Sequence, residues 1–118
     1  MHCVGPTFAE EELQALKEEL AFAPVLDELA TGLALFGSPT RLRICDLLSR
    51  TEQMCVCDLA QVLGLSVSAV SQNLAKLRAY RIVKYRRDAQ TLYYRLTDNA
   101  VTTAVLGLLE ANRQQAAE

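Results

Sequence analysis

The fold of this chain is decided by residues 55–79, whose sequence is CVCDLAQVLGLSVSAVSQNLAKLRA. Apolar residues recur at helical spacing in the first part of this stretch, at Leu59, Val62 and Leu63. Gly64 suits the turn that follows a helix, and Ser66 can cap a second helix by accepting a hydrogen bond from its first turn. Two helices joined by a tight turn predict a helix-turn-helix unit.

The second helix of this unit has two different faces. At about 100° per residue, one narrow stripe is apolar, and it consists of Val70, Leu74 and Leu77. The opposite face and its edges carry small and hydrogen-bonding residues, namely Ser68, Ser71, Gln72, Asn73, Ala75, Lys76 and Ala79. Small residues let a helix backbone approach a DNA groove, and Ser, Gln and Lys can contact base edges or phosphates. The alternative is a solvated face, which any two-helix unit could present.

Cys55 and Cys57 form a Cys-x-Cys at the start of the same unit. Residues two apart on a regular helix point roughly 200° apart, so both sulfurs can face one ion only if Cys55 precedes or begins the irregular first turn. A helix N-terminus also favours the thiolate that metals bind. The pair is typical of half of a soft-metal site, to which Cys3 could add a third sulfur. Thiolates select Cd(II), Pb(II), As(III), Cu(I) or Zn(II) over hard ions.

Three segments resemble the ArsR/SmtB family of metal-responsive repressors. Residues 51–60 (TEQMCVCDLA) resemble its metal-binding box, residues 65–74 (LSVSAVSQNL) its recognition helix, and residues 93–96 (YYRL) its wing. The similarity extends over residues 30–110. It implies a mainly α-helical winged helix-turn-helix fold with a β-hairpin wing, a homodimer formed through the first and last helices, and operator DNA as the partner.

The resemblance also bears on the third metal ligand. The arsenic-sensing type has a further Cys where this chain has Ala60, whereas the cadmium-sensing, CadC-like type brings N-terminal cysteines across the dimer, a role that Cys3 could fill. The family's zinc site on the last helix uses Asp and His residues. This chain keeps Asp98 but has no His after His2, so we expect no zinc site there.

The composition is that of one compact domain. The chain has 118 residues, of which 51% are hydrophobic, enough for a modest core. We expect residues 1–7 to form a flexible arm carrying His2 and Cys3, and residues 8–118 to form a single domain whose terminal helices make the dimer interface. No apolar run is long enough to span a bilayer, and the N-terminus lacks the features of a signal peptide. We therefore expect a cytoplasmic protein with reduced cysteines.

The net charge of −2 is unevenly distributed along the chain. Residues 76–95 hold one acid, Asp88, against seven basic residues: Lys76, Arg78, Arg81, Lys84, Arg86, Arg87 and Arg95. Residues 1–28 hold one basic residue, Lys17, against seven acids: Glu10, Glu11, Glu12, Glu18, Glu19, Asp27 and Glu28. A basic patch with an acidic remainder orients a protein on the phosphate backbone.

The remaining segments with helical periodicity predict four more helices around this unit. A first helix carries Leu13, Leu16 and Leu20 and ends before Pro24; a second carries Val25, Leu26, Leu29, Leu33 and Phe36 and stops at Gly37. Ser38 and Pro39 begin a third helix, in which Leu42, Cys45 and Leu48 share one side and Cys45 is expected to be a small core residue. Thr97 or Asp98 can cap a last, apolar helix that carries Val101, Ala104, Val105, Leu108 and Leu109.

Residues 82–87 and 92–96 alternate in polarity around the polar residues 88–91, which predicts a β-hairpin. Its inward residues would be Val83, Tyr85, Leu92, Tyr94 and Leu96. The tip carries Arg86, Arg87 and Gln90, which suit phosphate or minor-groove contacts.

Together with these patterns, the resemblance to the ArsR/SmtB family implies a repressor and not an enzyme. The metal-free dimer would bind a palindromic operator with its recognition helices in major grooves about 34 Å apart, and a soft metal ion at Cys55, Cys57 and Cys3 would release it.

One alternative is a repressor that responds to thiol oxidation. A thiol enzyme would need a Cys-His pair, and the one histidine is His2. A winged-helix module that binds protein alone would show no salt-sensitive DNA affinity.

Overall fold

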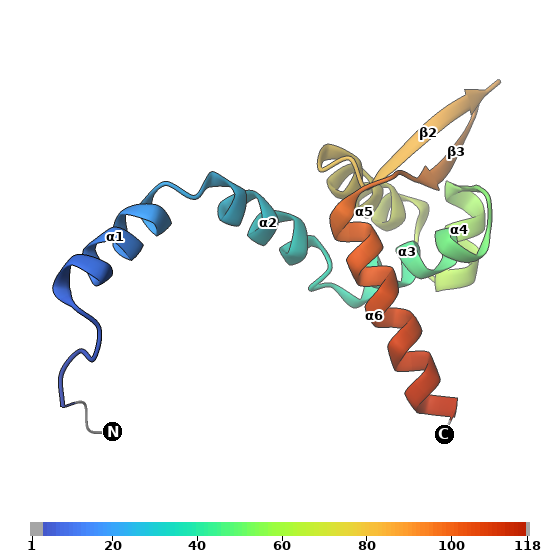
Figure 1. Cartoon of the computed structure of the whole chain (residues 1–118). Helices are drawn as coiled ribbons and strands as arrows, with labels where there is room; N and C mark the ends of the chain where they lie inside the picture. Colours follow the sequence, from blue (N-terminus) through green and yellow to red (C-terminus); the bar gives the residue numbers. More distant parts are fainter. Residues whose placement is uncertain (1–3, 118) are drawn as a thin grey trace. The chain divides into compact units, whose positions relative to one another are not determined.

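The structure is a computed structural model that describes residues 4–117. Its elements along the chain are α1 (Glu10–Ala21), α2 (Pro24–Leu35), α3 (Pro39–Arg50), β1 (Met54–Cys55), α4 (Val56–Leu63), α5 (Val67–Ala79), β2 (Val83–Asp88), β3 (Thr91–Leu96) and α6 (Ala100–Ala117) (Figure 1). This order confirms the predicted fold class, a mainly α-helical winged helix-turn-helix with a β-hairpin. His2 and Cys3 lie outside the described residues.

The chain divides into two units, with the boundary between Ala30 and Thr31 inside α2. In the first unit, α1 forms where the sequence predicts it, after the acidic run and before Pro24. None of its residues is buried, and its apolar stripe of Leu13, Leu16 and Leu20 is exposed. Within the described part of this unit, the apolar side of α1 therefore has no cover.

The second unit begins with the last turns of α2, which pack against the end of α5. Gly32 is buried, and a Cβ atom at this position would lie 2.6 Å from Cε1 of Tyr80. Phe36 follows α2 directly and is also buried. The close approach at Gly32 therefore places the end of α2 beside Tyr80, the residue that follows α5, which is the predicted recognition helix.

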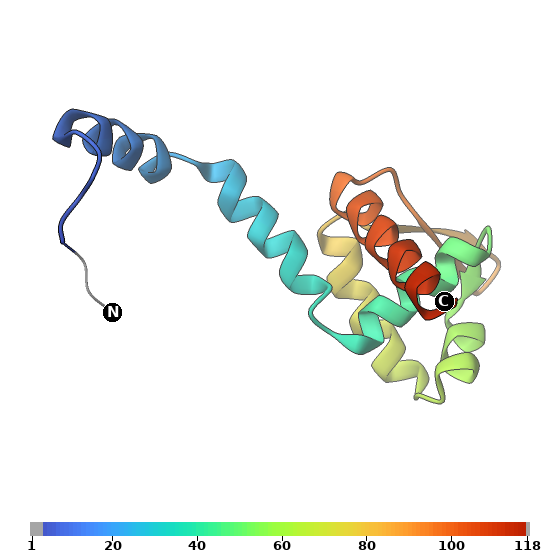
Figure 2. The same ribbon diagram turned by 60° about the horizontal axis from the view of Figure 1, so that its bottom comes forward.

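The core of the second unit is built from α3, α4, α5, the hairpin and α6. The predicted stripe of α5, Val70, Leu74 and Leu77, is fully buried. It packs with Ile44, Cys45, Leu48, Leu59, Ile82, Val83, Tyr94, Val101 and Val105. Figures 1 and 2 show α6 lying alongside α3, with which it shares contacts. Burying this stripe leaves the opposite face of α5 in solvent.

Local capping signals place the boundaries of the central helices. Ser38 Oγ accepts a hydrogen bond from the backbone N–H of Arg41 at 3.3 Å, with Pro39 as the first residue of α3. Ser66 Oγ accepts one from the N–H of Ala69 at 3.0 Å. Gly64 ends α4 with a φ of 66°, a left-handed conformation that glycine adopts without a Cβ clash. Both predicted caps and the predicted turn are confirmed.

The start of α6 differs from the prediction. Asn99, and not Thr97 or Asp98, caps this helix: its Oδ1 accepts from the N–H groups of Val101 at 2.9 Å and Thr102 at 3.4 Å. Thr97 instead donates its hydroxyl to the carbonyl oxygens of Arg81 and Ile82. Because the helix begins at Ala100, only the side chain of residue 99 reaches the free amides of the first turn.

The hairpin forms with a register that pairs Tyr85 with Tyr94 and Arg86 with Tyr93. Its tip projects away from the helices (Figure 1). A third strand that the sequence analysis did not predict, β1, adds to the free edge of β3 and pairs Met54 with Tyr94 and Cys55 with Tyr93. Two residues are too few to show alternation, so this strand leaves no periodic signal. It makes the Cys-x-Cys segment part of the sheet.

The hairpin turn consists of Ala89 and Gln90, and Ala89 has a φ of 56°. A side chain is disfavoured there by roughly 1 kcal/mol relative to glycine. We expect Ala89→Gly to raise the free energy of unfolding by about that amount in urea titrations. The matched control is Ala104→Gly on the exposed side of α6, where the same change should lower it by about 1 kcal/mol. A loss of stability in Ala89→Gly would contradict this account of the turn.

Among residues 4–117, no helix combines the length and the apolar character needed to cross a membrane.

Candidate DNA-binding surface and thiol site

The face of α5 opposite its buried stripe is solvent-accessible. The side chains predicted to contact DNA from this face, Ser68, Ser71, Gln72 and Lys76, are all exposed. Lys76 and Arg78 lie in the last turn of the helix and add positive charge there. A helix with exposed Ser, Gln and Lys side chains and a buried opposite face has the chemistry of a major-groove helix.

Asn73 differs from its neighbours because its amide is engaged within the chain. Its Nδ2 donates to the carbonyl oxygen of Ala69 at 2.9 Å, and its Oδ1 accepts from Nη1 of Arg41 at 3.1 Å. Arg41 also donates its Nε to the carbonyl oxygen of Leu35 at the end of α2, at 2.6 Å. Arg41, to which the sequence analysis gave no role, thus joins α2, α3 and α5. That Asn73 also contacts DNA stays a prediction.

The basic residues predicted to form a patch are all exposed: Lys76, Arg78, Arg81, Lys84, Arg86, Arg87 and Arg95. They follow the second half of α5, the turn after it and both strands of the wing. Gln90 at the turn is exposed as well. Exposed cations on α5 and on the hairpin have the charge that suits contact with a phosphate backbone.

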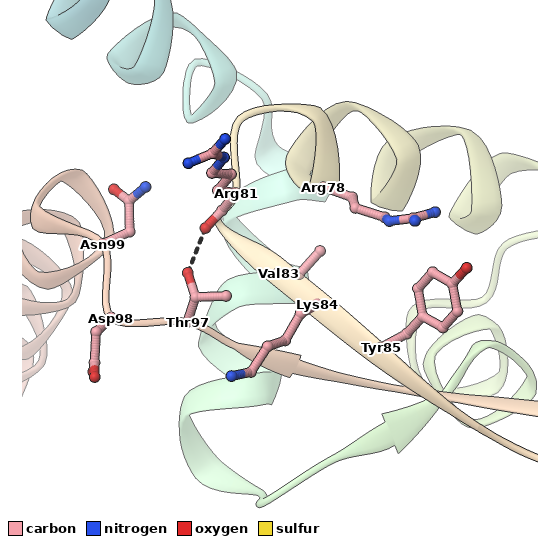
Figure 3. A pocket seen from close by; sticks show the side chains of 8 residues that line it. All are labelled: Arg78, Arg81, Val83, Lys84, Tyr85, Thr97, Asp98 and Asn99. Carbon is pink, nitrogen blue, oxygen red and sulfur yellow. Dashed lines mark hydrogen bonds between the residues drawn. The ribbon is translucent and has the colours of Figure 1, made fainter.

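A cavity of 720 Å³ lies at the base of the wing and is lined by Arg78, Arg81, Val83, Lys84, Tyr85, Thr97, Asp98 and Asn99. Its cations do not converge. The guanidinium of Arg78 lies 4.3 Å from the centre of the Tyr85 ring, while Arg81 and Lys84 point in other directions (Figure 3). The cavity also holds the carboxylate of Asp98. Its residues therefore contribute separate charges to the surface and no focused anion site.

The Cys-x-Cys lies at the junction of β1 and α4. Cys55 is the residue before α4, with φ −82° and ψ 166°, and Cys57 is in the first turn. Cys55 is half-buried and Cys57 is exposed. The extended backbone at Cys55 breaks the helical geometry that would separate the two side chains by roughly 200°. The structure thus meets the backbone condition that was necessary for a shared ion, and binding of one ion by both sulfurs stays a prediction.

The two cysteines open into a cavity of 580 Å³ that they share with α5 and the hairpin. Val67 and Ser71 of α5 line one part of it, and the wing segment from Gln90 to Tyr93 lines another. Ser71 and Gln90 are themselves predicted DNA contacts. A change in geometry at the sulfurs is therefore adjacent both to the recognition helix and to the wing.

Cys45 is a core residue, as predicted. It is fully buried in α3, and burial raises the pKa of its thiol to about 12. Among residues 4–117, no three His, Cys, Asp or Glu side chains gather into a metal site. Cys3, the predicted third ligand, lies outside that range.

This difference between the thiols can be tested by alkylation of the native chain. Because the thiolate is the reactive form, iodoacetamide at pH 8 should modify Cys57 and Cys55 while Cys45 reacts only after denaturation. Peptide mass spectrometry after timed quenching measures each site. Modification of Cys45 in the folded chain at the rate of Cys57 would contradict its place in the core.

Comparison with known proteins places these features in a family. Residues 38–85 match the family described as "Bacterial regulatory protein, arsR family". A transcriptional repressor SmtB homolog from Synechocystis is 38% identical over 99 residues, covering 84% of this chain and 74% of the relative. The nodulation protein NolR from Rhizobium meliloti is 49% identical over 83 residues, covering 70% and 66%. A cadmium resistance regulatory protein CadC homolog from Staphylococcus aureus is 32% identical over 96 residues, covering 81% and 78%.

Two solved structures have a fold similar to that of this chain. The antimony-specific transcriptional repressor AntR has a TM-score of 0.70 at 26% identity and covers 98% of this chain and 99% of its own. The homodimeric winged helix-turn-helix domain of Mb0332 from Mycobacterium bovis has a TM-score of 0.68 at 27% identity, covering 81% and 87%. The relatives are transcriptional regulators, which confirms the prediction that this chain is not an enzyme. This chain belongs to the ArsR/SmtB family of transcriptional repressors.

Proposed function

We propose that this chain is a metal-responsive repressor, which binds a palindromic operator when metal-free and is released by a soft metal ion bound at cysteine thiolates. The observation that carries the proposal is the shared cavity, in which Cys55 and Cys57 lie beside residues of the recognition helix and the wing. The similarity to a cadmium resistance regulator, the CadC homolog, and to the antimony-specific repressor AntR supports an effector of this class.

The donor set fits soft metals. Cys55 and Cys57 supply two sulfurs at the N-terminus of α4, and sulfur is a preferred ligand of soft ions. Since residues 4–117 gather no third ligand, we propose that Cys3 completes the site, from the same subunit or from its partner. Sulfur ligation would suit Cd(II), As(III), Pb(II) or Zn(II).

We further propose that the repressor is a homodimer. An apolar groove of 470 Å³ lies along α6, lined by Leu33, Phe36, Leu42, Val105, Leu108, Leu109 and Asn112. Leu108 keeps 70% of its surface exposed, and α1 presents a second bare apolar stripe in its own unit. A second copy is the simplest cover for such surfaces, and the Mycobacterium bovis relative is a homodimer. Two-fold symmetry would place the α5 helices about 34 Å apart on a palindrome.

Metal capture would act through the position of the cysteines in the chain. Drawing the sulfurs of Cys55 and Cys57 together moves β1 and the first turn of α4, and thereby the wing strand and the recognition helix beside them. A coupling of about 1 to 3 kcal/mol, typical of such switches, would weaken DNA binding between roughly 5- and 150-fold.

Titration of Cd(II) or As(III) into the protein bound to its operator tests this proposal. The operator would be a duplex selected from a random pool by the metal-free protein, and anisotropy would report binding. We expect release to coincide with thiolate-to-metal absorption. Binding that is unchanged at saturating metal would refute the proposal, and release by mild peroxide without metal would favour the oxidation-sensing alternative.

A further inference from the structure

We propose that Gln53, Tyr93 and Arg86 form a relay through which the state of the thiol site sets the position of a DNA-contacting cation on the wing. The inference rests on the proposed function, because it concerns how metal at Cys55 and Cys57 weakens DNA binding. It assigns Gln53 and Tyr93 as positioning residues that do not themselves contact DNA or metal.

The first contact of the relay is a hydrogen bond between residues 53–57, here called the thiol segment, and the wing. Arg86 Nε donates to Gln53 Oε1 at 3.0 Å, although the two residues are 33 positions apart. Gln53 directly precedes β1 and is two residues from Cys55. A guanidinium has five N–H donors, so this bond leaves others for a phosphate oxygen. Arg86 is thus fixed by the thiol segment while it remains exposed.

The second contact is made by Tyr93, in the middle strand of the sheet. Tyr93 pairs with Cys55 on one side and with Arg86 on the other. Directly opposite residues of antiparallel strands point to the same face, so Cys55, Tyr93 and Arg86 form a row across the sheet. The guanidinium carbon of Arg86 lies 4.7 Å from the centre of the Tyr93 ring, and Tyr93 also lines the cavity of the cysteines.

One contact that holds Arg86 therefore comes from Gln53, two residues before Cys55, and the other comes from Tyr93, the wing residue that pairs with Cys55 and lines the cavity of the cysteines. In the metal-free protein they restrict a long side chain, which lowers the conformational entropy lost when Arg86 contacts DNA. Metal capture at Cys55 and Cys57 displaces β1. Gln53 moves with this strand, and so does Cys55, the residue that pairs with Tyr93. Arg86 then loses its supports, and the DNA contact weakens.

Arg87 provides the matched control. It is the next residue of β2, is also exposed, and pairs with Leu92, so its side chain lies on the opposite face of the sheet. The change Arg87→Lys replaces a neighbouring wing guanidinium by an ammonium group without touching the row of Cys55, Tyr93 and Arg86.

The experiment measures operator affinity with and without saturating Cd(II) for the full chain and for Gln53→Ala, Arg86→Lys and Arg87→Lys. Gln53→Ala should lower the metal-free affinity by about three- to ten-fold, the equivalent of one hydrogen bond, and leave the metal-bound affinity unchanged. Arg86→Lys keeps the charge but lacks Nε, so it should reduce the ratio of the two affinities in the same way. Arg87→Lys should change both affinities by the same factor and preserve the ratio.

The outcomes separate the relay from the function on which it rests. If neither Cd(II) nor As(III) releases the wild-type chain, the proposed function is wrong and the relay is wrong with it. If the wild type is released but Gln53→Ala and Arg86→Lys keep its affinity ratio, the relay alone is wrong. A ratio that drops equally in Arg87→Lys would also refute the relay, since any wing change would then suffice. Thiolate-to-metal absorption, unchanged in all three variants, shows that the metal site is intact.

Discussion

The Cys55→Ser/Cys57→Ser variant is expected to stay on operator DNA at Cd(II) concentrations that release the wild-type chain. A hydroxyl group is nearly isosteric with a thiol but is a poor ligand for soft ions, so the variant should lose the thiolate-to-metal absorption together with the response. The whole coupling, about 1 to 3 kcal/mol, should disappear while metal-free affinity is kept. Parallel Cd(II) titrations of both proteins on the same labelled duplex measure the difference.

The control for this variant is Cys45→Ala. Cys45 is buried and its thiol has a pKa raised to about 12 by burial, so it cannot supply a thiolate near neutral pH. The control should therefore be released by Cd(II) like the wild type, even if removal of a core sulfur lowers its stability. Release of the double serine variant at wild-type metal concentrations would place the sensing site elsewhere in the chain.

The second large effect is expected from the exposed face of α5. Gln72→Ala should change the sequence specificity of DNA binding, whereas Lys76→Ala should change the affinity for all sequences. An amide can bond a base edge in two places, so loss of Gln72 should relax discrimination at one base pair by about 1 to 3 kcal/mol. Lys76 carries a charge suited to phosphate, so its loss should weaken binding to all sequences and reduce the salt slope by about one. Anisotropy on matched and mismatched duplexes over a range of salt concentrations separates the two results.

Gln61→Ala serves as the control for this pair. Gln61 is exposed on α4, outside the face formed by Ser68, Ser71, Gln72 and Lys76. Its replacement should leave both the affinity and the salt slope unchanged. Equal losses for Gln72→Ala on cognate and mismatched duplexes would show that this residue does not read a base.

Much of the fold could be predicted because its determinants are local. Ser38 and Ser66 cap helices through hydrogen bonds that span three residues, and Gly64 takes the left-handed conformation at the position where a turn needs it. The stripe of α5 is visible as helical periodicity and is fully buried. That Cys55 must precede or begin the first turn was only a condition for a shared ion, and the structure places it directly before α4.

What the sequence could not predict depends on distant pairings. The strand β1 exists because β3 offers a free edge nearly 40 residues later, and its two residues carry no pattern of their own. The bond between Gln53 and Arg86 joins two polar side chains that are 33 positions apart, so no local pattern indicates it. The cap at Asn99 was missed because three consecutive residues could each serve, and only the helix start at Ala100 decides among them.

The tyrosines give this protein an intrinsic optical probe at the position where it is needed. The chain has no tryptophan, and its four tyrosines all lie between residues 80 and 94. Tyr93 lines the cavity of the cysteines, and the rings of Tyr85 and Tyr94 lie 5.5 Å apart at the base of the wing. Ultraviolet fluorescence of the unlabelled chain therefore originates from the wing and the end of α5, with no background from the acidic N-terminal helix.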